Sequence, residues 1–174
     1  MNRILSSVVA LGVMVATAAS AQHVRVSLGA GGVVPTGDYS TIDNAGWHAL
    51  GALEVSLPRS PLSVRGDLMY GQTGHDASSI ITGSTKLTGG TADLVYHIGA
   101  PAVPVRLYLL AGVGYYNVDI SGSKEGKVAF GGGTGVSIGM GPAHLFAEGR
   151  WMSIQTSGSA MTFLPVTLGM TFGM

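Results

Sequence analysis

The chain has no cysteine, few charged residues and no long apolar run after its first segment. The absence of cysteine excludes a disulfide scaffold and any metal site built on thiolates. Only 10% of the 174 residues are charged, against roughly 25% in an ordinary soluble domain. Nine basic side chains balance nine acidic ones, so we expect no nucleic acid partner.

Glycine and apolar residues take the place of the missing charge. The chain contains 28 glycines, and 46% of its residues are hydrophobic. The glycines follow no three-residue period, which excludes collagen, and the high hydropathy argues against disorder. The length allows one domain.

The first segment, Met1–Ala21, has the three parts of a secretory signal peptide. Arg3 precedes an apolar run from Ile4 to Ala16, and Ala19-Ser20-Ala21 forms a small-residue cleavage site. A membrane anchor is the alternative, but the apolar run is shorter than the ~20 residues that a spanning helix needs. We therefore expect export, cleavage before Gln22, and a mature domain over 22–174.

Turn signals divide the mature chain into eight segments. The segments cover 23–34, 46–57, 62–72, 88–98, 105–116, 127–140, 143–154 and 161–173. The connections 35–45, 73–87, 117–126 and 155–160 are long or polar, whereas 58–61, 99–104 and 141–142 are short and contain proline. Alternating long loops and short turns are typical of an up-and-down transmembrane β-barrel, with no further helix spanning the membrane.

Polar and apolar residues alternate within the segments, and only one face carries charge. In 62–72, for example, Arg65 and Asp67 lie on one face, and Val64, Gly66 and Leu68 lie on the other. A soluble barrel, such as a lipocalin-like one, would carry many scattered charges on its polar face. Here the polar face has about one charge per strand, and the lysines fall in the expected loops, at Lys86, Lys124 and Lys127. We infer that the apolar face points outward to lipid and the polar face lines the lumen.

Four arginines and four carboxylates occupy the polar face. They are Arg25, Arg65, Arg106, Arg150, Glu54, Asp67, Asp93 and Glu148. An eight-stranded barrel has an interior just wide enough for side chains to fill it. An unpaired buried charge is costly, so we expect a network of ion pairs that closes the lumen rather than lines a pore.

Aromatic residues fall near the ends of the segments, as in the interfacial girdles of membrane barrels. The expected long-loop girdle comprises Trp47, Tyr70, Tyr115, Phe130, Trp151 and Phe163, and the short-turn girdle comprises Tyr96 and Phe172. Ordinary core packing of these rings is the alternative.

The last segment ends in a polar–x–Gly–x–x–aromatic–x–hydrophobic pattern, formed by Thr167, Gly169, Phe172 and Met174. With this pattern, the strand Phe146–Trp151 and the signal peptide, the chain resembles the small OmpA/OmpX-like outer-membrane β-barrel family. Many members end in Phe where this chain has Met174. The resemblance implies an eight-stranded antiparallel barrel that is inserted from the periplasm. It also implies that periplasmic chaperones and the barrel-assembly machinery recognise the chain, with the last strand as assembly signal, and that the monomer resides in outer-membrane lipid.

No residue pattern predicts a catalytic, metal or cofactor site. Five histidines lie in separate segments, at His23, His48, His75, His97 and His144, and none shows the spacing of metal ligands. None begins the His-x-Ser pattern expected of a lipid-A deacylase. Glu148 or Asp93 could pair with His97 or His144, but carboxylates held in ion pairs are poor general acids. The glycine run 131–135 lacks the Gly-Lys-Ser/Thr ending of a phosphate loop, and we expect it to leave room for inward side chains.

The sequence thus predicts an integral outer-membrane barrel with a structural or surface role and no enzymatic activity. A narrow porin-like channel or small-ligand carrier is the first alternative. A lipid-A-modifying enzyme is the second.

Overall fold

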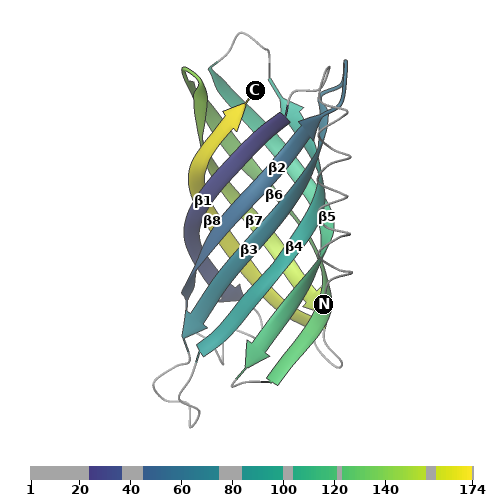
Figure 1. Ribbon diagram of the computed structural model, residues 1–174, viewed down its shortest axis with the longest axis vertical. Helices are drawn as coiled ribbons and strands as arrows, with labels where there is room; N and C mark the ends of the chain where they lie inside the picture. Colours follow the sequence, from purple (N-terminus) through teal and green to yellow (C-terminus); the bar gives the residue numbers. More distant parts are fainter. Residues whose placement is uncertain are drawn as a thin grey trace, which may run out of the picture.

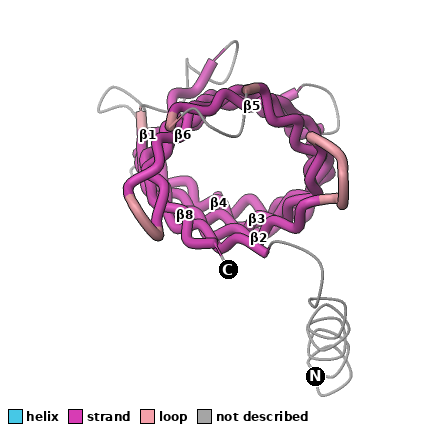
Figure 2. Tube along the Cα trace, turned by 90° about the horizontal axis from the view of Figure 1, so that it is seen from above, coloured by secondary structure: helices cyan, strands magenta, loops and turns pink. Residues whose placement is uncertain are grey.

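The computed structural model describes residues 24–36, 45–74, 84–99, 104–120, 123–155 and 160–173. Eight strands make up this part of the chain, and they close into a barrel (Figures 1 and 2). The strands are β1 (Val24–Thr36), β2 (Gly46–Ser56), β3 (Leu62–Gly74), β4 (Ser84–Ile98), β5 (Val105–Ile120), β6 (Ser123–Met140), β7 (Ala143–Gln155) and β8 (Ala160–Gly173). Each strand pairs antiparallel with its sequence neighbours, and β1 pairs with β8 to complete the ring. The predicted fold class is therefore confirmed.

Short turns lie at one rim, together with the C-terminal end of β8 (the upper rim in Figure 1). The turn 58–61 joins β2 to β3, and Gly141-Pro142 joins β6 to β7. Gly141 has a φ of 71°, a conformation that glycine adopts without steric cost. The segment 1–21, predicted as a signal peptide, lies outside the described residues, and so do Met174 and the middle of the connections 35–45, 73–87 and 155–160.

Three strand ends were wrongly predicted as loops. Residues 117–120 continue β5 and 123–126 begin β6, so that Ile120 pairs with Ser123. Likewise 84–87 belong to β4, which places Lys86 on a strand, and the other two lysines predicted to lie in loops, Lys124 and Lys127, are part of β6. At the long-loop rim, β5 continues for five residues past Tyr115, which was predicted to belong to the aromatic girdle. These stretches are rich in serine, glycine, threonine and charged residues, which is the composition of a loop.

The outer wall of the barrel is apolar. Large hydrophobic side chains point outward from every strand; examples are Val26, Trp47, Val64, Leu94, Leu107, Val128, Leu145 and Val166. Leu68 is 74% exposed and Leu168 is 63% exposed. In the described ranges, no helix has the length and hydropathy of a membrane-spanning segment. The inference that the apolar face is the outer face is thus confirmed.

The aromatic girdle is formed with one exception. Trp47 packs on Tyr70 with ring centroids 5.7 Å apart, and Phe130 packs on Trp151 at 6.1 Å, all four on the outer wall. Phe163 was predicted to join them but is fully buried inside. The reason is that successive side chains of a strand point to opposite faces. Phe163 lies four positions before Thr167, which faces the lumen, so it faces the lumen as well.

Buried apolar side chains fill the lumen toward the long-loop rim. This apolar layer comprises Val33, Met69, Leu87, Tyr116, Ala129, Met152, Ile154 and Phe163. The rings of Tyr116 and Phe163 meet edge to face with centroids 6.4 Å apart. The layer therefore closes that end of the barrel with close-packed side chains.

We expect Phe163→Ala to lower the free energy of unfolding by about 3–5 kcal/mol, because it opens a cavity in the apolar layer. Phe130→Ala, which removes a ring from the lipid-facing wall, serves as the matched control and should cost clearly less. The measurement is denaturant unfolding of the barrel in detergent micelles, followed by tryptophan fluorescence. Equal losses for the two variants would contradict the inward placement of Phe163.

Candidate functional site

Two opposite strands each carry an arginine and a carboxylate on the lumen side. Arg65 and Asp67 lie on β3, and Glu148 and Arg150 lie on β7. A spacing of two places both members of each pair on the same face of a strand. In the closed order of eight strands, β3 and β7 are four strands apart in either direction. The two pairs therefore face each other across the barrel.

These four side chains form a closed ring of ion pairs, which we call the charged ring. On β3, Arg65 Nε lies 2.7 Å from Asp67 Oδ1, and on β7, Arg150 Nε lies 2.6 Å from Glu148 Oε1. Two further pairs cross the lumen: Arg65 Nη1 lies 2.7 Å from Glu148 Oε2, and Arg150 Nη2 pairs with Asp67 Oδ2. Each guanidinium thus contacts one carboxylate of its own strand and one of the opposite strand.

Three further groups bind to the charged ring. Asp93 of β4 accepts a 3.0 Å contact from Arg150 Nη1, and Tyr108 of β5 donates its hydroxyl to Glu148 at 2.8 Å. The hydroxyl of Thr91 donates to Asp93 at 2.8 Å. The five charged residues of this cluster are only 2–6% exposed. Burial of so many charges is tolerated because every one of them is paired and hydrogen-bonded.

Glycines on the neighbouring strands make room for the cluster. Gly133 of β6 lies opposite Arg150, and a Cβ there would come within 2.9 Å of Arg150 Cγ. A Cβ on Gly135 would collide with the ring of Tyr108. The expectation that the glycine run 131–135 leaves room for inward side chains is confirmed at these two positions.

A second polar group lies nearer the short-turn rim. Arg25 Nη1 of β1 lies 3.3 Å from Glu54 Oε1 of β2, and Arg25 Nη2 donates to Ser56 at 2.9 Å. His97 Nε2 of β4 lies 2.8 Å from the same Glu54 oxygen. Arg106 of β5 lines the space beside them. We call these residues the mouth group.

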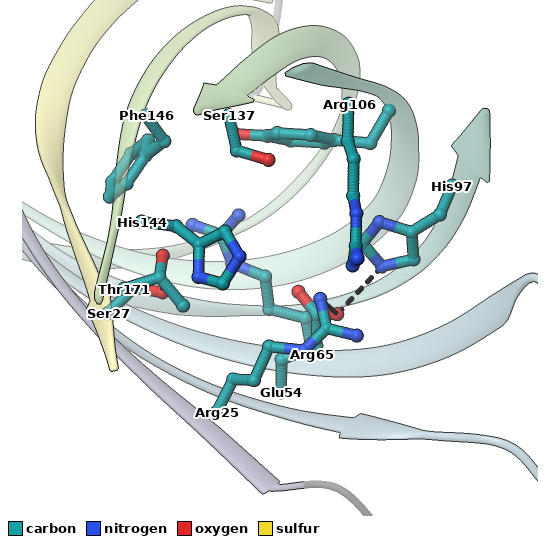
Figure 3. Close-up of a pocket in the computed structure, with 11 residues that line it drawn as sticks. Arg25, Ser27, Glu54, Arg65, His97, Arg106, Ser137, His144, Phe146 and Thr171 are labelled. Atoms are coloured by element: carbon teal, nitrogen blue, oxygen red, sulfur yellow. Dashed lines mark hydrogen bonds and ion pairs between the residues drawn. The ribbon is translucent and has the colours of Figure 1, made fainter. Parts of the chain in front are cut away.

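Two spaces adjoin the mouth group, and Figure 3 shows the inner one. The inner cavity has a volume of about 50 Å³, and its lining includes Arg25, Glu54, Arg65, His97 and Arg106. The mouth, about 660 Å³, is lined by Arg25, His97 and Arg106 together with the turn residues 57–61. Figure 3 shows Arg25 and Arg106 reaching from opposite sides of the barrel toward the same space.

All eight charged residues singled out in the sequence lie on the lumen side, but in two groups. Arg65, Asp67, Asp93, Glu148 and Arg150 form the buried cluster, whereas Arg25, Glu54 and Arg106 belong to the mouth group. Sequence reasoning missed the roles of Tyr108 and Thr91 as donors to the carboxylates. The available signal was their spacing: Tyr108 lies two residues from Arg106 on β5, and Thr91 lies two residues from Asp93 on β4, so each shares the lumen face of its charged neighbour.

The C-terminal pattern has a structural meaning at two positions. Thr167 Oγ1 lies 2.8 Å from His48 Nε2 inside the barrel. Gly169 lies under Phe146, where a Cβ would come within 2.6 Å of the ring. Phe172 points outward and is 46% exposed. Recognition of this pattern by an assembly machinery stays a prediction.

Among the histidines in the described ranges, His97 contacts both a carboxylate and a serine, but not in the geometry of a catalytic triad. His97 Nε2 lies 2.8 Å from Glu54 Oε1 and 3.2 Å from Ser63 Oγ. A triad histidine uses one ring nitrogen for the acid and the other for the nucleophile, whereas here a single nitrogen faces both. The structure pairs His97 with Glu54 rather than with Glu148 or Asp93. In the described part of the chain, no group of three or more histidine, aspartate or glutamate side chains is arranged so that it could hold a metal ion.

Comparison with known proteins agrees with this architecture. Among solved structures, a major outer membrane protein from Thermus thermophilus aligns with a TM-score of 0.63 at 14% identity, covering 88% of this chain and 100% of that one. Neisserial surface protein A aligns with a TM-score of 0.60 at 19% identity, covering 88% and 97%. Ail, the attachment invasion locus protein of Yersinia pestis, aligns with a TM-score of 0.60 at 19% identity, covering 87% and 98%. At these identities the likeness shows the fold alone.

The sequence itself identifies the family. A search of curated protein sequences finds no significant match. The family described as "Outer membrane protein beta-barrel domain" matches residues 4–172, which is nearly the whole chain. The chain therefore belongs to the outer membrane protein β-barrel domain family.

Proposed function

We propose that this protein is a monomeric integral protein of the outer membrane, with a closed lumen and a structural or surface role. The charged ring carries the proposal. Its two transverse ion pairs join Arg65 to Glu148 and Arg150 to Asp67, so they tie β3 to β7 across the centre of the barrel. An ion or solute moving along the axis would have to break these buried contacts.

The apolar layer supports the same conclusion from the other side of the ring. Its side chains, among them Met69 and Phe163, are at most 5% exposed. A permeant ion would have to pass through close-packed hydrocarbon after leaving the charged ring. Two seals of opposite chemistry thus follow each other along the axis, which favours a closed barrel over the porin-like alternative.

Lipid is the partner that the outer wall fits. Outward side chains such as Leu68 and Leu168 offer hydrocarbon, and the outward aromatic rings mark where headgroups would lie. During biogenesis, periplasmic chaperones and the barrel-assembly machinery would handle the chain through the C-terminal pattern. For the enzyme alternative, the contacts of His97 offer no support, and we do not propose an activity.

Purified barrel in planar lipid bilayers should show no stable conductance steps, because both seals lie across the axis. The measurement is single-channel recording in concentrated potassium chloride, with a known porin as the positive control. Reproducible steps whose size follows the salt concentration would contradict a closed lumen and favour the channel alternative.

Arg150→Met should lower the free energy of unfolding by about 3–5 kcal/mol, since it leaves three buried carboxylates short of a partner. Lys86→Met removes one charge from the exposed end of β4 and should change stability by about 0.5 kcal/mol or less. Denaturant unfolding in detergent micelles measures both. Similar small effects would mean that the charged ring does not stabilise the barrel.

Phe172→Ala should slow insertion by the assembly machinery reconstituted in proteoliposomes, because it removes the aromatic residue of the C-terminal pattern. Leu168→Ala is the matched control, since Leu168 faces lipid on the same strand but at an unspecified position of the pattern. Spontaneous refolding into detergent should be alike for the two variants. Equal rates of machine-assisted insertion would show that Phe172 is not read as a signal.

A further inference from the structure

Two grooves interrupt the apolar outer wall of the barrel. The first has a volume of about 470 Å³ and lies over β1 to β4. The second has a volume of about 310 Å³ and lies over β5 to β8. We call them the first slot and the second slot. The first is centred on β2 and β3 and the second on β6 and β7, so in the closed ring of eight strands they lie on opposite sides of the barrel.

The first slot has a floor of small residues between two large ones. Ala49 and Gly51 of β2 form the floor. Gly51 pairs with Leu28 of β1 on one side and with Leu68 of β3 on the other. Both leucines are more than half exposed, so they stand out from the wall and form the sides of the groove.

The second slot is built in the same way. Its floor and sides are formed by Thr134, Ala147, Gly149, Leu107 and Val166. A Cβ on Gly149 would meet no atom within 4 Å, so the groove is open above this residue. The hydroxyl of Thr134 donates to the backbone carbonyl of Tyr108 at 3.1 Å. This hydrogen bond satisfies the donor within the wall, so an apolar occupant leaves it unaffected.

A tryptophan lies at the long-loop end of each slot. The outward residues are, in order from this rim, Trp47, Ala49 and Gly51 on β2, and Trp151, Gly149 and Ala147 on β7. Each slot therefore begins two residues, or about 7 Å, from its tryptophan. Each tryptophan also packs on an aromatic ring of the adjacent strand. Since interfacial aromatic rings lie at the level of the headgroups, the slots lie at the depth of the acyl chains.

We propose that each slot holds a segment of one saturated acyl chain of a lipid in the leaflet at the long-loop rim. The inference rests on the proposed placement of the barrel in membrane lipid. The outward side chains that line the slots carry no charge. In a membrane, van der Waals packing decides which apolar group lies against a wall. A straight chain contacts the floor and both sides of a slot, whereas a cis double bond bends the chain away and loses such contacts.

A second copy of this barrel fits the slots less well than a lipid chain does. A two-fold contact places a surface against the same surface of its partner. Slot would then face slot, and the space between them would stay unfilled, with the loss of dispersion contacts. A single acyl chain is narrow and flexible enough to enter the groove from the bilayer.

The two tryptophans of the chain report on the two slots separately. The variants W151F and W47F of the full mature barrel each keep one of them. Both are refolded into fluid bilayers that mix dibrominated phosphatidylcholine, which quenches indole fluorescence on contact, with unbrominated dioleoyl- or dimyristoylphosphatidylcholine. We expect the dioleoyl lipid to displace the quencher in proportion to its mole fraction. The saturated dimyristoyl lipid should displace it as if about threefold more concentrated, because a few additional carbon contacts suffice for that factor.

Filling one slot should abolish the preference for the saturated lipid at that slot alone. G149L places a side chain in the second slot, so we expect the preference to disappear at Trp151 and to remain at Trp47. G51L should do the reverse. G66L is the matched control, because Gly66 also faces outward with open space above it but does not line either slot. This variant should leave the preference unchanged at both tryptophans.

Three results would overturn the proposal. They are quenching that follows the mole fraction of every lipid at both tryptophans, an equal loss of preference in G66L and G149L, and tryptophans that brominated lipid does not quench. The last result would show that protein, such as a second copy, covers the slots. A barrel that conducts ions and keeps the lipid preference would refute only the closed lumen. A silent barrel that is quenched without preference would refute only the slots.

Discussion

The pairing of buried charges across the lumen is the constraint on which this barrel depends. A guanidinium taken out of water has to find carboxylates within reach, and in a narrow barrel the nearest ones lie on the same strand or on the opposite strand. Arg65 and Arg150 use both. This requirement also governs register, because a shift of β3 by one residue would turn Arg65 and Asp67 toward lipid. The charged ring thus specifies the barrel as well as stabilising it.

The glycine content follows from the same constraint. Two arginines, three carboxylates and the ring of Tyr108 fill the centre of the lumen, so the neighbouring wall has to lie close to them. Gly133 and Gly135 provide that approach, since a Cβ at either position would meet Arg150 or Tyr108. Glycine also faces the lumen at Gly112, where a Cβ would collide with Asp93. A chain rich in glycine and poor in charge is therefore the composition expected of a narrow barrel filled by a few large polar side chains.

The fold could be predicted from the sequence because the alternation of side chains between the two faces of a strand is a local property. Along each strand, alternation alone assigns Arg65 to the lumen and Leu68 to the wall, and the turn residues count the strands. The same alternation places Phe163 inside, on the face of Thr167, whereas its aromatic ring suggests the outer girdle. Which arginine meets which carboxylate could not be derived, because that depends on the stagger between strands that are distant in the sequence. The extended ends of β5 and β6 could not be predicted because the charged residues Asp119 and Lys124, with the serines and glycine between them, give this stretch the composition of a loop.

The equal numbers of arginines and carboxylates conceal an axial separation of charge. In the buried cluster, where water cannot screen, the excess carboxylate is compensated by hydroxyl donors from Tyr108 and Thr91. The other two arginines of the lumen, Arg25 and Arg106, line the mouth, where solvent and salt weaken the interactions between charges. A lumen whose arginines and carboxylates are equal in number can therefore be closed at its centre by ion pairs.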